Sequence, residues 1–266
     1  MINKVVYSFW SKPTKNKYIG FNSKKTFENC ARLSVLTSRK WAECVELVTD
    51  KKGYKLLIED LKLPFNSVRV ELDVLNNIDD KHWALGKIYA CAIQNTPFMH
   101  IDFDAIWFNK PPDYLLNAPT AFQSKVYIDN PENSIYINLV KQVGDCSELK
   151  INKHIKIQQL GEYAVNCGFM CFNDRSIIPI WQECALDYIK KIKPNQNGYF
   201  DSCIIFEQFF LSKLLQANKI TIKTLKQKGI FVSVGSNLNY VHLMGYNKRI
   251  PLEEEKIANK LKQFKK

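Results

Sequence analysis

The amino-acid sequence predicts an α/β fold in which helices flank a Rossmann-like, mainly parallel β-sheet. The chain has 266 residues, of which 46% are hydrophobic and 24% charged, as is typical of a globular protein with a large core. Over the first hundred residues, short apolar runs alternate with segments in which apolar residues recur at helical spacing. With only 10 Gly, 10 Pro and no internal repeat, the sequence shows no linker, so we expect one domain.

Four short apolar runs in the first half have the length and composition of buried strands. They are Lys4–Phe9, Cys44–Val48, Ser67–Leu72 and Pro97–Asp102. The spacing of apolar residues predicts helices over Phe27–Trp41, Lys51–Leu61 and Asp79–Gln94. Strands that alternate with helices form parallel sheets, which bind ligands beyond the carboxyl ends of their strands. The expected binding edge is therefore made by Tyr7–Ser11 and His100–Trp107.

The second half of the chain has a less regular pattern. Apolar runs predict strands over Thr120–Lys125, Ala164–Phe172 and Gly229–Val234. Apolar spacing and charge predict helices over Asn133–Val143, Ser176–Ile192 and Asp201–Leu215, and a charged helix or tail over Pro251–Lys266. Residues 144–160 are polar and have no pattern that predicts an element.

The formal net charge of +12 is spread unevenly along the chain. Residues 1–60 carry a net charge of +6, residues 61–210 carry −3, and residues 211–266 carry +9. A basic protein favours an anionic partner, which can be a nucleic acid, an anionic membrane surface or a phosphorylated small molecule. Composition by itself does not choose among these three.

The sequence contains no segment of about 18 consecutive apolar residues, the length that a membrane-spanning helix needs. The apolar run near the N-terminus is too short for a secretory signal, so we expect a cytoplasmic protein. The eight cysteines form no CxxC pair, and several lie in apolar runs, which predicts buried, reduced thiols. Cys167 and Cys171 are four residues apart, but without a second pair this spacing is weak support for a zinc site.

The pair Asp102 and Asp104 is the clearest candidate for chemistry. An apolar strand leads into it, Phe103 separates the two acids, and the apolar run Ala105–Phe108 follows at once. Mg²⁺ and Mn²⁺ prefer oxygen ligands and often bind carboxylates together with substrate phosphates. An ordinary loop with two solvated acids is the alternative, but such loops are seldom so apolar on both flanks. The pattern therefore favours a divalent metal site.

A second candidate group lies late in the chain, where His242, Gly245 and Lys248 follow one another at three-residue spacing. A neutral imidazole can complete a Mn²⁺ site, a glycine lets backbone approach a phosphate, and a lysine offers a positive charge to a diphosphate. A lone histidine is nevertheless more often structural.

Two weaker candidates lie between these groups. Asn166 precedes Gly168 in an apolar strand, which indicates either a ligand close to the backbone or a bulge whose asparagine is satisfied locally. Glu207 lies in an aromatic-rich helix, where a carboxylate is either a charge on the helix face or a group with a partner or a task.

Taken in this order, the motifs resemble the GT-A glycosyltransferases that use nucleotide sugars. The most similar group is the retaining one that includes glycogenin and the bacterial lipopolysaccharide galactosyltransferases. In that group an apolar strand runs into a DxD motif, as at Asp102 and Asp104. An Asn-x-Gly segment follows on a central strand, as at Asn166 and Gly168. The resemblance covers most of residues 1–250.

The later motifs continue the resemblance. Glu207-Gln208 resembles the Asp/Glu-Gln pair that the group carries on a helix, and residues 242–248 resemble its late His-x-x-Gly-x-x-Lys motif. Lys87 matches a basic residue on the helix before the DxD. The sequence departs from the group where Arg249-Ile250 replaces the usual Pro-Trp, where Glu stands for the commoner Asp, and over residues 126–160, which match no motif.

The resemblance implies a GT-A domain over residues 1–250, with a nucleotide-binding half at 1–108 and a smaller sugar and acceptor half at 109–250. It implies a metal-dependent transfer of a sugar from a nucleoside-diphosphate sugar, with UDP favoured, to a glycan or lipid-linked acceptor in surface polysaccharide assembly. The basic C-terminal helix or tail, residues 251–266, is then expected to contact an anionic membrane at its inner face.

The resemblance also implies roles for particular residues. Asp102, Asp104 and His242 would hold Mn²⁺ or Mg²⁺. The donor would contact the two aspartates and, in addition, Tyr7, Ser8, Phe9, Trp10, Lys87, Phe103, Gly245 and Lys248. Lys248 would stabilise the leaving diphosphate. Asn166 and Glu207 would act at the sugar, Glu207 as the base if the enzyme inverts; if it retains, the leaving phosphate takes the proton.

Two other functions remain open at this point. The first is a nucleic-acid-binding protein or metal nuclease, which the net charge and the 12% of aromatic residues permit, although no predicted helix carries a dense Arg/Lys stripe. The second is a catalytically silent protein of the same fold. All three proposed metal ligands are present, which favours an enzyme over a silent protein. Without an Arg/Lys stripe, we expect no nucleic-acid partner.

Overall fold

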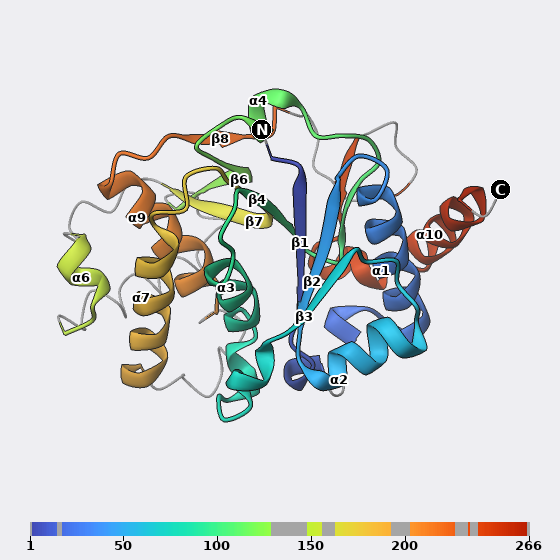
Figure 1. Ribbon diagram of the computed structural model, residues 1–266, viewed down its shortest axis with the longest axis horizontal. Coiled ribbons are helices and arrows are strands. Elements are labelled where there is room, and N and C mark those ends of the chain that lie inside the picture. Colours follow the sequence, from blue (N-terminus) through green and yellow to red (C-terminus); the bar gives the residue numbers. More distant parts are fainter. Residues whose placement is uncertain are drawn as a thin grey trace.

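The computed structural model describes residues 2–14, 18–128, 148–155, 163–192, 203–226, 234 and 239–264. Within them, a main sheet has seven strands in the order β3-β2-β1-β4-β7-β6-β8, and a small sheet pairs β5 with β9 (Figure 1). The strand bounds are β1 Lys4–Phe9, β2 Cys44–Thr49, β3 Ser67–Val70, β4 Phe98–Ile101, β5 Ala105–Trp107, β6 Thr120–Tyr127, β7 Tyr163–Phe172, β8 Ile222–Thr224 and β9 Tyr240–His242.

The first half of the chain builds the parallel part of the main sheet. β1 pairs in parallel with β2, from Lys4 opposite Cys44 to Phe9 opposite Thr49, and with β4 on its other side. β2 in turn pairs in parallel with β3. These four strands lie within one or two residues of the predicted runs, so the mainly parallel α/β class is confirmed.

The second half adds strands of both directions. β7 runs antiparallel to β4, with Phe98 opposite Phe172, and β6 runs antiparallel to β7. β8 lies at the edge, parallel to β6. The three-residue strands β5, β8 and β9 are absent from the sequence-based expectation, because three residues are too few to show a period of two.

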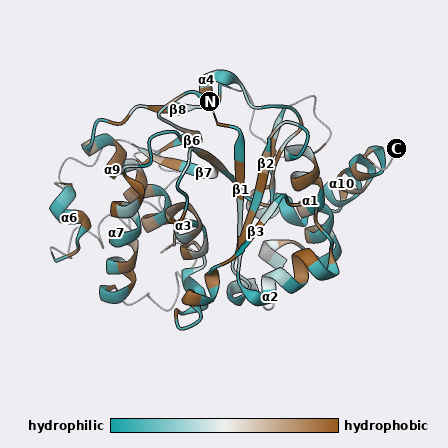
Figure 2. Ribbon diagram, viewed as in Figure 1, coloured by the Kyte–Doolittle hydropathy of each residue, from teal (hydrophilic) through white to brown (hydrophobic). Residues whose placement is uncertain are grey.

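Helices cover the sheet on two sides. Figure 1 shows α3, α7 and α9 on one side and α1 and α10 on the other. The side chains of β1 alternate accordingly: Val5 and Tyr7 enter the core on the α1 side, and Val6 enters the core on the α3 side. In Figure 2 the strands accordingly show brown, apolar residues interspersed with white and teal ones. The helix bounds are α1 Lys24–Ser38, α2 Lys51–Tyr54, α3 Leu85–Ala92, α4 Asp113–Leu116, α6 Ile151–His154, α7 Ile178–Lys191, α9 Phe210–Ala217 and α10 Pro251–Gln263.

Several predicted helices differ in detail. The segment expected as one helix over Lys51–Leu61 starts as α2 and continues as a π-helix over Lys55–Asp60. In the segment Asp201–Leu215, a π-helix over Ile205–Phe209 precedes α9, and residues 201–202 lie outside the described part. Such π-helical turns leave no signature in the spacing of apolar residues.

The predicted helix over Asp79–Gln94 is divided. Its first turn is a 3₁₀ helix at Asp80–His82, which the side chain of Asp79 caps by accepting from the N–H of Lys81, and α3 follows. The predicted helix Asn133–Val143 lies outside the described residues. So does the predicted strand Gly229–Val234, apart from Val234, which lies in a turn.

The C-terminal segment is the helix α10, packed against the protein, so the alternative of a loose tail is wrong for the described residues. Its Ile257 and Leu261 are buried beside α1, and the carboxylate of Glu253 accepts from the N–H of Val234 at 2.7 Å. Lys213, one of the basic residues toward the end of the chain, is buried on α9 rather than exposed. Among the described helices, none combines the length and the apolar character that crossing a bilayer would require. Contact with a membrane surface stays a prediction.

The described cysteines confirm the expectation of buried, reduced thiols. The seven described cysteines are free, and all but Cys44 are buried. Cys167 belongs to the core on the α3 side, whereas Cys171 belongs to the core on the α1 side. The sheet therefore separates the two thiols, and they do not share a zinc ion.

Candidate functional site

Asp102 and Asp104 lie in the turn between β4 and β5, at the carboxyl edge of the parallel strands. The N–H of Asp102 donates to the carbonyl of Gly168 at 3.0 Å, and the N–H of Ala105 donates to the carbonyl of Asp102 at 2.9 Å. The turn is thus tied to β7 and closed on itself. Its backbone holds both carboxylates at the edge where such sheets bind ligands.

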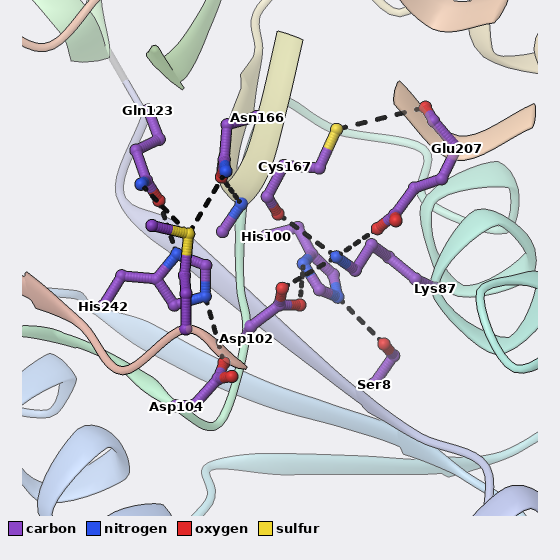
Figure 3. Close-up of polar contacts among 12 residues, drawn as sticks. Ser8, Lys87, His100, Asp102, Asp104, Gln123, Asn166, Cys167, Glu207 and His242 are labelled. Atoms are coloured by element: carbon purple, nitrogen blue, oxygen red, sulfur yellow. Dashed lines mark hydrogen bonds and ion pairs between the residues drawn. The ribbon is translucent and has the colours of Figure 1, made fainter. Parts of the chain in front are cut away.

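The small β5–β9 sheet brings His242 to this turn. His242 lies opposite Ala105 in the antiparallel pair, and the N–H of Leu243 donates to the carbonyl of Asp104 at 2.9 Å. As a result, one ligand atom from each of Asp102, Asp104 and His242 lies within 4.8 Å of the others (Figure 3). The three residues predicted as metal ligands are brought together by the structure.

The ligand atoms at this triad that form no ion pair with a lysine suit a hard divalent cation. Asp102 holds Lys87 through Oδ2 (2.8 Å), and Asp104 holds Lys248 through Oδ2 (2.5 Å). The Oδ1 atom of each aspartate is outside these ion pairs, and that of Asp104 lies 3.5 Å from Nε2 of His242. Two carboxylate oxygens and an imidazole nitrogen are ligands that Mn²⁺ and Mg²⁺ accept.

Gln123 on β6, which the sequence does not single out, fixes the imidazole of His242. Its side-chain oxygen lies 2.7 Å from Nδ1 of His242 and accepts from the hydroxyl of Tyr240 at 2.8 Å. Because an amide oxygen only accepts, Nδ1 is the donor of this contact, and Nε2, which lies 3.5 Å from Oδ1 of Asp104, is the ring nitrogen that could bind a metal. Orientation of this kind by a neighbouring residue is typical of metal-binding histidines.

The packing around His242 requires a glycine at position 168. A Cβ there would lie 2.3 Å from Nδ1 of His242 and 2.3 Å from the side-chain oxygen of Gln123. We expect Gly168→Ala to displace both groups and to weaken Mn²⁺ binding about 10- to 100-fold, as loss of a contact that orients a ligand does. Titration of free Mn²⁺ followed by electron paramagnetic resonance measures this. An unchanged affinity in a folded Gly168→Ala protein would show that the imidazole is held in some other way.

Lys248 reaches the site from a 3₁₀ helix at Gly245–Arg249. Burial alone would raise the pKa of Asp104, but the ammonium of Lys248, which forms an ion pair with this carboxylate, holds that pKa well below its usual value. Asp104 therefore stays a carboxylate, as a metal ligand must. Gly245 at the start of this helix has a φ of +52° and open space around the position of a Cβ, so the backbone there is accessible.

Lys87 on α3 lies between two carboxylates. Its Nζ is 2.8 Å from Oδ2 of Asp102 and 2.5 Å from Oε1 of Glu207, and it donates to the carbonyl of Cys167 at 3.2 Å. Burial disfavours the ammonium, but the two carboxylates raise the pKa of Lys87 above its usual value. Burial also raises the pKa of Asp102 to about 6, against the pull of Lys87 and with the help of Asp104 and Glu207.

Two residues predicted to act at the sugar have partners of their own. The side-chain oxygen of Asn166 accepts from the N–H of Gly168 at 3.0 Å, and its amide nitrogen donates to Sδ of Met244 at 3.4 Å. Glu207 is only 1% exposed and faces Lys87. A Glu207 carboxylate in this position is not open to a solvent-borne acceptor.

The aromatic residues near the end of β1 are core residues in this structure. The hydroxyl of Tyr7 is hydrogen-bonded to Ser34 and Ser38, and its ring packs against Phe103. The exposed fractions of Phe9, Trp10 and Phe103 are 3%, 5% and 4%, so these rings present no open face for stacking on a base. The reason is the alternation along β1, which sends successive side chains into the two cores.

Ser8, in contrast, is half-buried at the site and contacts His100, which the sequence places at the expected binding edge without indicating a role for its side chain. Its Oγ lies 2.9 Å from Nε2 of His100, whose Nδ1 is 3.8 Å from Oδ1 of Asp102. Burial, together with the charge of Lys87, lowers the pKa of His100 well below its usual range, so the ring is neutral. A polar residue in a strand whose other members are apolar, as in Phe98–Ile101, was the signal that could have found it.

Comparison with known proteins adds a family to this geometry. Residues 3–264 match the model of a family described as a family of unknown function, DUF6734. The chain belongs to this family. No curated protein matches the sequence at a significant level.

Solved structures resemble this DUF6734 chain only distantly. Mouse xyloside xylosyltransferase 1 in its apo form has 11% identity and a TM-score of 0.43, with 84% of each chain covered. The glycosyltransferase GlyE of Streptococcus pneumoniae TIGR4 has 9% identity and a TM-score of 0.38, covering 85% of this chain and 45% of that one. The inositol-1-phosphate CTP transferase of T. maritima has 12% identity and a TM-score of 0.40, covering 97% and 95%. Similarity at this level assigns no activity to the chain.

Proposed function

We propose that this DUF6734 chain is a metal-dependent glycosyltransferase that moves a sugar from a nucleoside-diphosphate sugar to an acceptor hydroxyl. The observation that carries the proposal is the convergence of Asp102, Asp104 and His242 within 4.8 Å at the carboxyl edge of a parallel sheet. In line with the sequence motifs, UDP is the favoured nucleotide, and a glycan or lipid-linked sugar is the favoured acceptor.

The charge balance of the site supports an anionic, metal-bound ligand. The carboxylates of Asp102, Asp104 and Glu207 carry one more charge than the ammonium groups of Lys87 and Lys248 can neutralise. The site by itself therefore attracts a cation. With a divalent cation in place its net charge becomes positive, and it then attracts a diphosphate.

Asp102, Asp104 and His242 would hold Mn²⁺ or Mg²⁺, which when bound supplies Lewis-acid stabilisation for the two phosphates. Lys248 lies against one of these ligands, so its ammonium is placed to stabilise the negative charge that grows on the leaving diphosphate as the glycosidic bond breaks. Gly245 leaves the backbone beside it open for the same phosphates. Glu207 acts through Lys87, which it holds against Asp102, rather than on the acceptor.

Calorimetric titration with UDP in the presence and absence of Mn²⁺ tests the proposal. We expect UDP to bind only with the metal present and the protein to release UDP slowly from one member of a panel of UDP-sugars. Lys248→Gln should weaken UDP binding, whereas Lys219→Gln, at an exposed lysine after α9, should not. Binding of UDP that needs neither the metal nor Lys248 would contradict the proposal.

The same titration has an expected pH dependence. A metal ligand must be deprotonated, and the pKa of Asp102 is raised to about 6 while that of Asp104 is lowered. Protonation of Asp102 therefore competes with the metal as the pH falls through about 6, and Mn²⁺ affinity should decrease below that pH. An affinity that is flat between pH 7 and pH 5 would contradict the role of Asp102.

A further inference from the structure

Ser8, His100 and Asp102 form a line of polar groups across the carboxyl ends of β1 and β4 (Figure 3). In the register of this parallel pair, Val6 lies opposite His100. Ser8, the next residue of β1 on the same face as Val6, therefore reaches the histidine ring. The Oγ of Ser8 lies 2.9 Å from Nε2, and Nδ1 on the other side of the ring lies 3.8 Å from Oδ1 of Asp102. The imidazole thus stands between a half-buried hydroxyl and a metal ligand.

The Nδ1 atom of His100 is a buried polar atom with no hydrogen-bond partner among the described residues. The side chain is 1% exposed, so bulk water does not reach it. Buried polar atoms nearly always have a partner, and one without a partner calls for an explanation. The group that this atom faces is Oδ1 of Asp102, the oxygen that the Lys87 ion pair does not use.

The direction of each proton follows from the charges. A neutral imidazole carries one N–H and one lone pair. If Nε2 carried the proton, the lone pair of Nδ1 would face a carboxylate oxygen and be repelled by it. If Nδ1 carries the proton, the Ser8 hydroxyl donates to Nε2, and the positive N–H lies near the carboxylate, at 3.8 Å too far for a hydrogen bond but close enough for electrostatic attraction. The second arrangement is electrostatically favourable at both ends of the ring.

We infer that His100 is a positioning residue of the metal site: the Asp102 carboxylate favours the Nδ1–H tautomer, the Ser8 hydroxyl donates to Nε2 of that tautomer, and the Nδ1–H attracts Oδ1 of Asp102 and keeps it toward His242 and Asp104. Lys87 holds the other oxygen of Asp102, Oδ2, so both carboxylate oxygens have a nitrogen neighbour. The inference rests on the proposed metal site and adds to it a link between the end of β1 and the first metal ligand.

Nitrogen-15 spectra of the histidine rings test the tautomer without any metal or substrate. We expect the signal that disappears in His100→Asn to show a protonated Nδ1 and an unprotonated Nε2. Ser8→Ala removes the donor to Nε2 but leaves Asp102 in place, so the Nδ1–H form should remain the main one. A wild-type ring protonated at Nε2 overturns the inference, whatever metal the protein binds.

Mn²⁺ titration tests the consequence for the metal site. In His100→Asn the amide nitrogen stands near the position of Nδ1, so this variant should keep an affinity close to that of the wild type. His100→Leu fills the space without an N–H and should bind Mn²⁺ about 10-fold more weakly. His82→Leu is the matched control, because His82 is also buried with an unpartnered Nδ1 but lies outside the site, and it should bind normally.

The outcomes separate the inference from the proposed function. If the wild type and His100→Leu bind Mn²⁺ equally, His100 only fills space and the inference is overturned while the metal site stands. If the wild type shows no saturable binding, both the metal site and the positioning role are overturned. Should His100→Leu fail to fold, the tautomer measured on the wild type still decides the inference.

Discussion

Replacing Asp102 and Asp104 together by asparagine should lower metal-dependent turnover by at least about 10³-fold and remove saturable Mn²⁺ binding. Asparagine keeps the size and one side-chain oxygen of aspartate, so the loss reports the two charges rather than the shape of the turn. The backbone contacts of the turn, from the N–H of Asp102 to Gly168 and from Leu243 to Asp104, do not involve these side chains and should persist. Initial rates of UDP release at several Mn²⁺ concentrations measure the effect.

A matched acidic pair provides the control. Asp79 and Asp80 are likewise two acids close together in the sequence, at the start of a helical turn, and the side chain of Asp79 is 51% exposed. Their double asparagine variant should keep its metal-dependent turnover. Undiminished turnover in a folded Asp102→Asn/Asp104→Asn protein would remove the metal assignment altogether.

Lys87→Met should lower the free energy of unfolding by about 3–5 kcal/mol, the usual effect of removing one partner from a buried ion pair. Lys87 and Glu207 are 7% and 1% exposed, and their charged atoms lie 2.5 Å apart. Methionine fills the volume of the lysine stem but leaves the Glu207 carboxylate in the core without its cation. Urea denaturation at neutral pH measures the change.

The double variant Lys87→Met/Glu207→Gln should recover part of the lost stability, because no uncompensated charge then remains. Lys150→Met is the control on an exposed ion pair with Glu183, where solvent screens the interaction and the change should be small. Equal destabilisation by Lys87→Met and Lys150→Met would mean that the buried pair has no special role in the fold.

The parallel half of the sheet was predictable from the sequence because its signals are local. Each strand from β1 to β4 is a short apolar run, and the intervening segments carry helical spacing or caps that a window of a dozen residues contains. The DxD pair was predictable for the same reason, since Asp102 and Asp104 are marked by their apolar flanks and by the end of β4.

Other features of the site were not predictable because they depend on pairings between distant segments. The strand β9 has three residues, and its register against β5 decides that His242 lies beside Asp104. In the sequence, Gln123 and His100 look like ordinary polar residues of strands. In the structure, β9 brings His242 to Gln123, and β1 brings Ser8 to His100. The sequence predicts that the rings at the end of β1 contact the donor, whereas the alternation of a strand covered on both faces buries them.

The sequence by itself determined which chemical groups this protein has and where its strands end: two carboxylates after a buried strand, a late histidine and lysine, and the mainly parallel fold class. The tertiary structure decided which groups meet, which are shielded from water and which are paired, including Lys87 with Glu207 and Ser8 with His100. The physical reason is that residue types and local periodicity are properties of short segments. Distances between ligand atoms instead follow from strand register and core packing, which are set by many weak contacts between segments far apart in the chain.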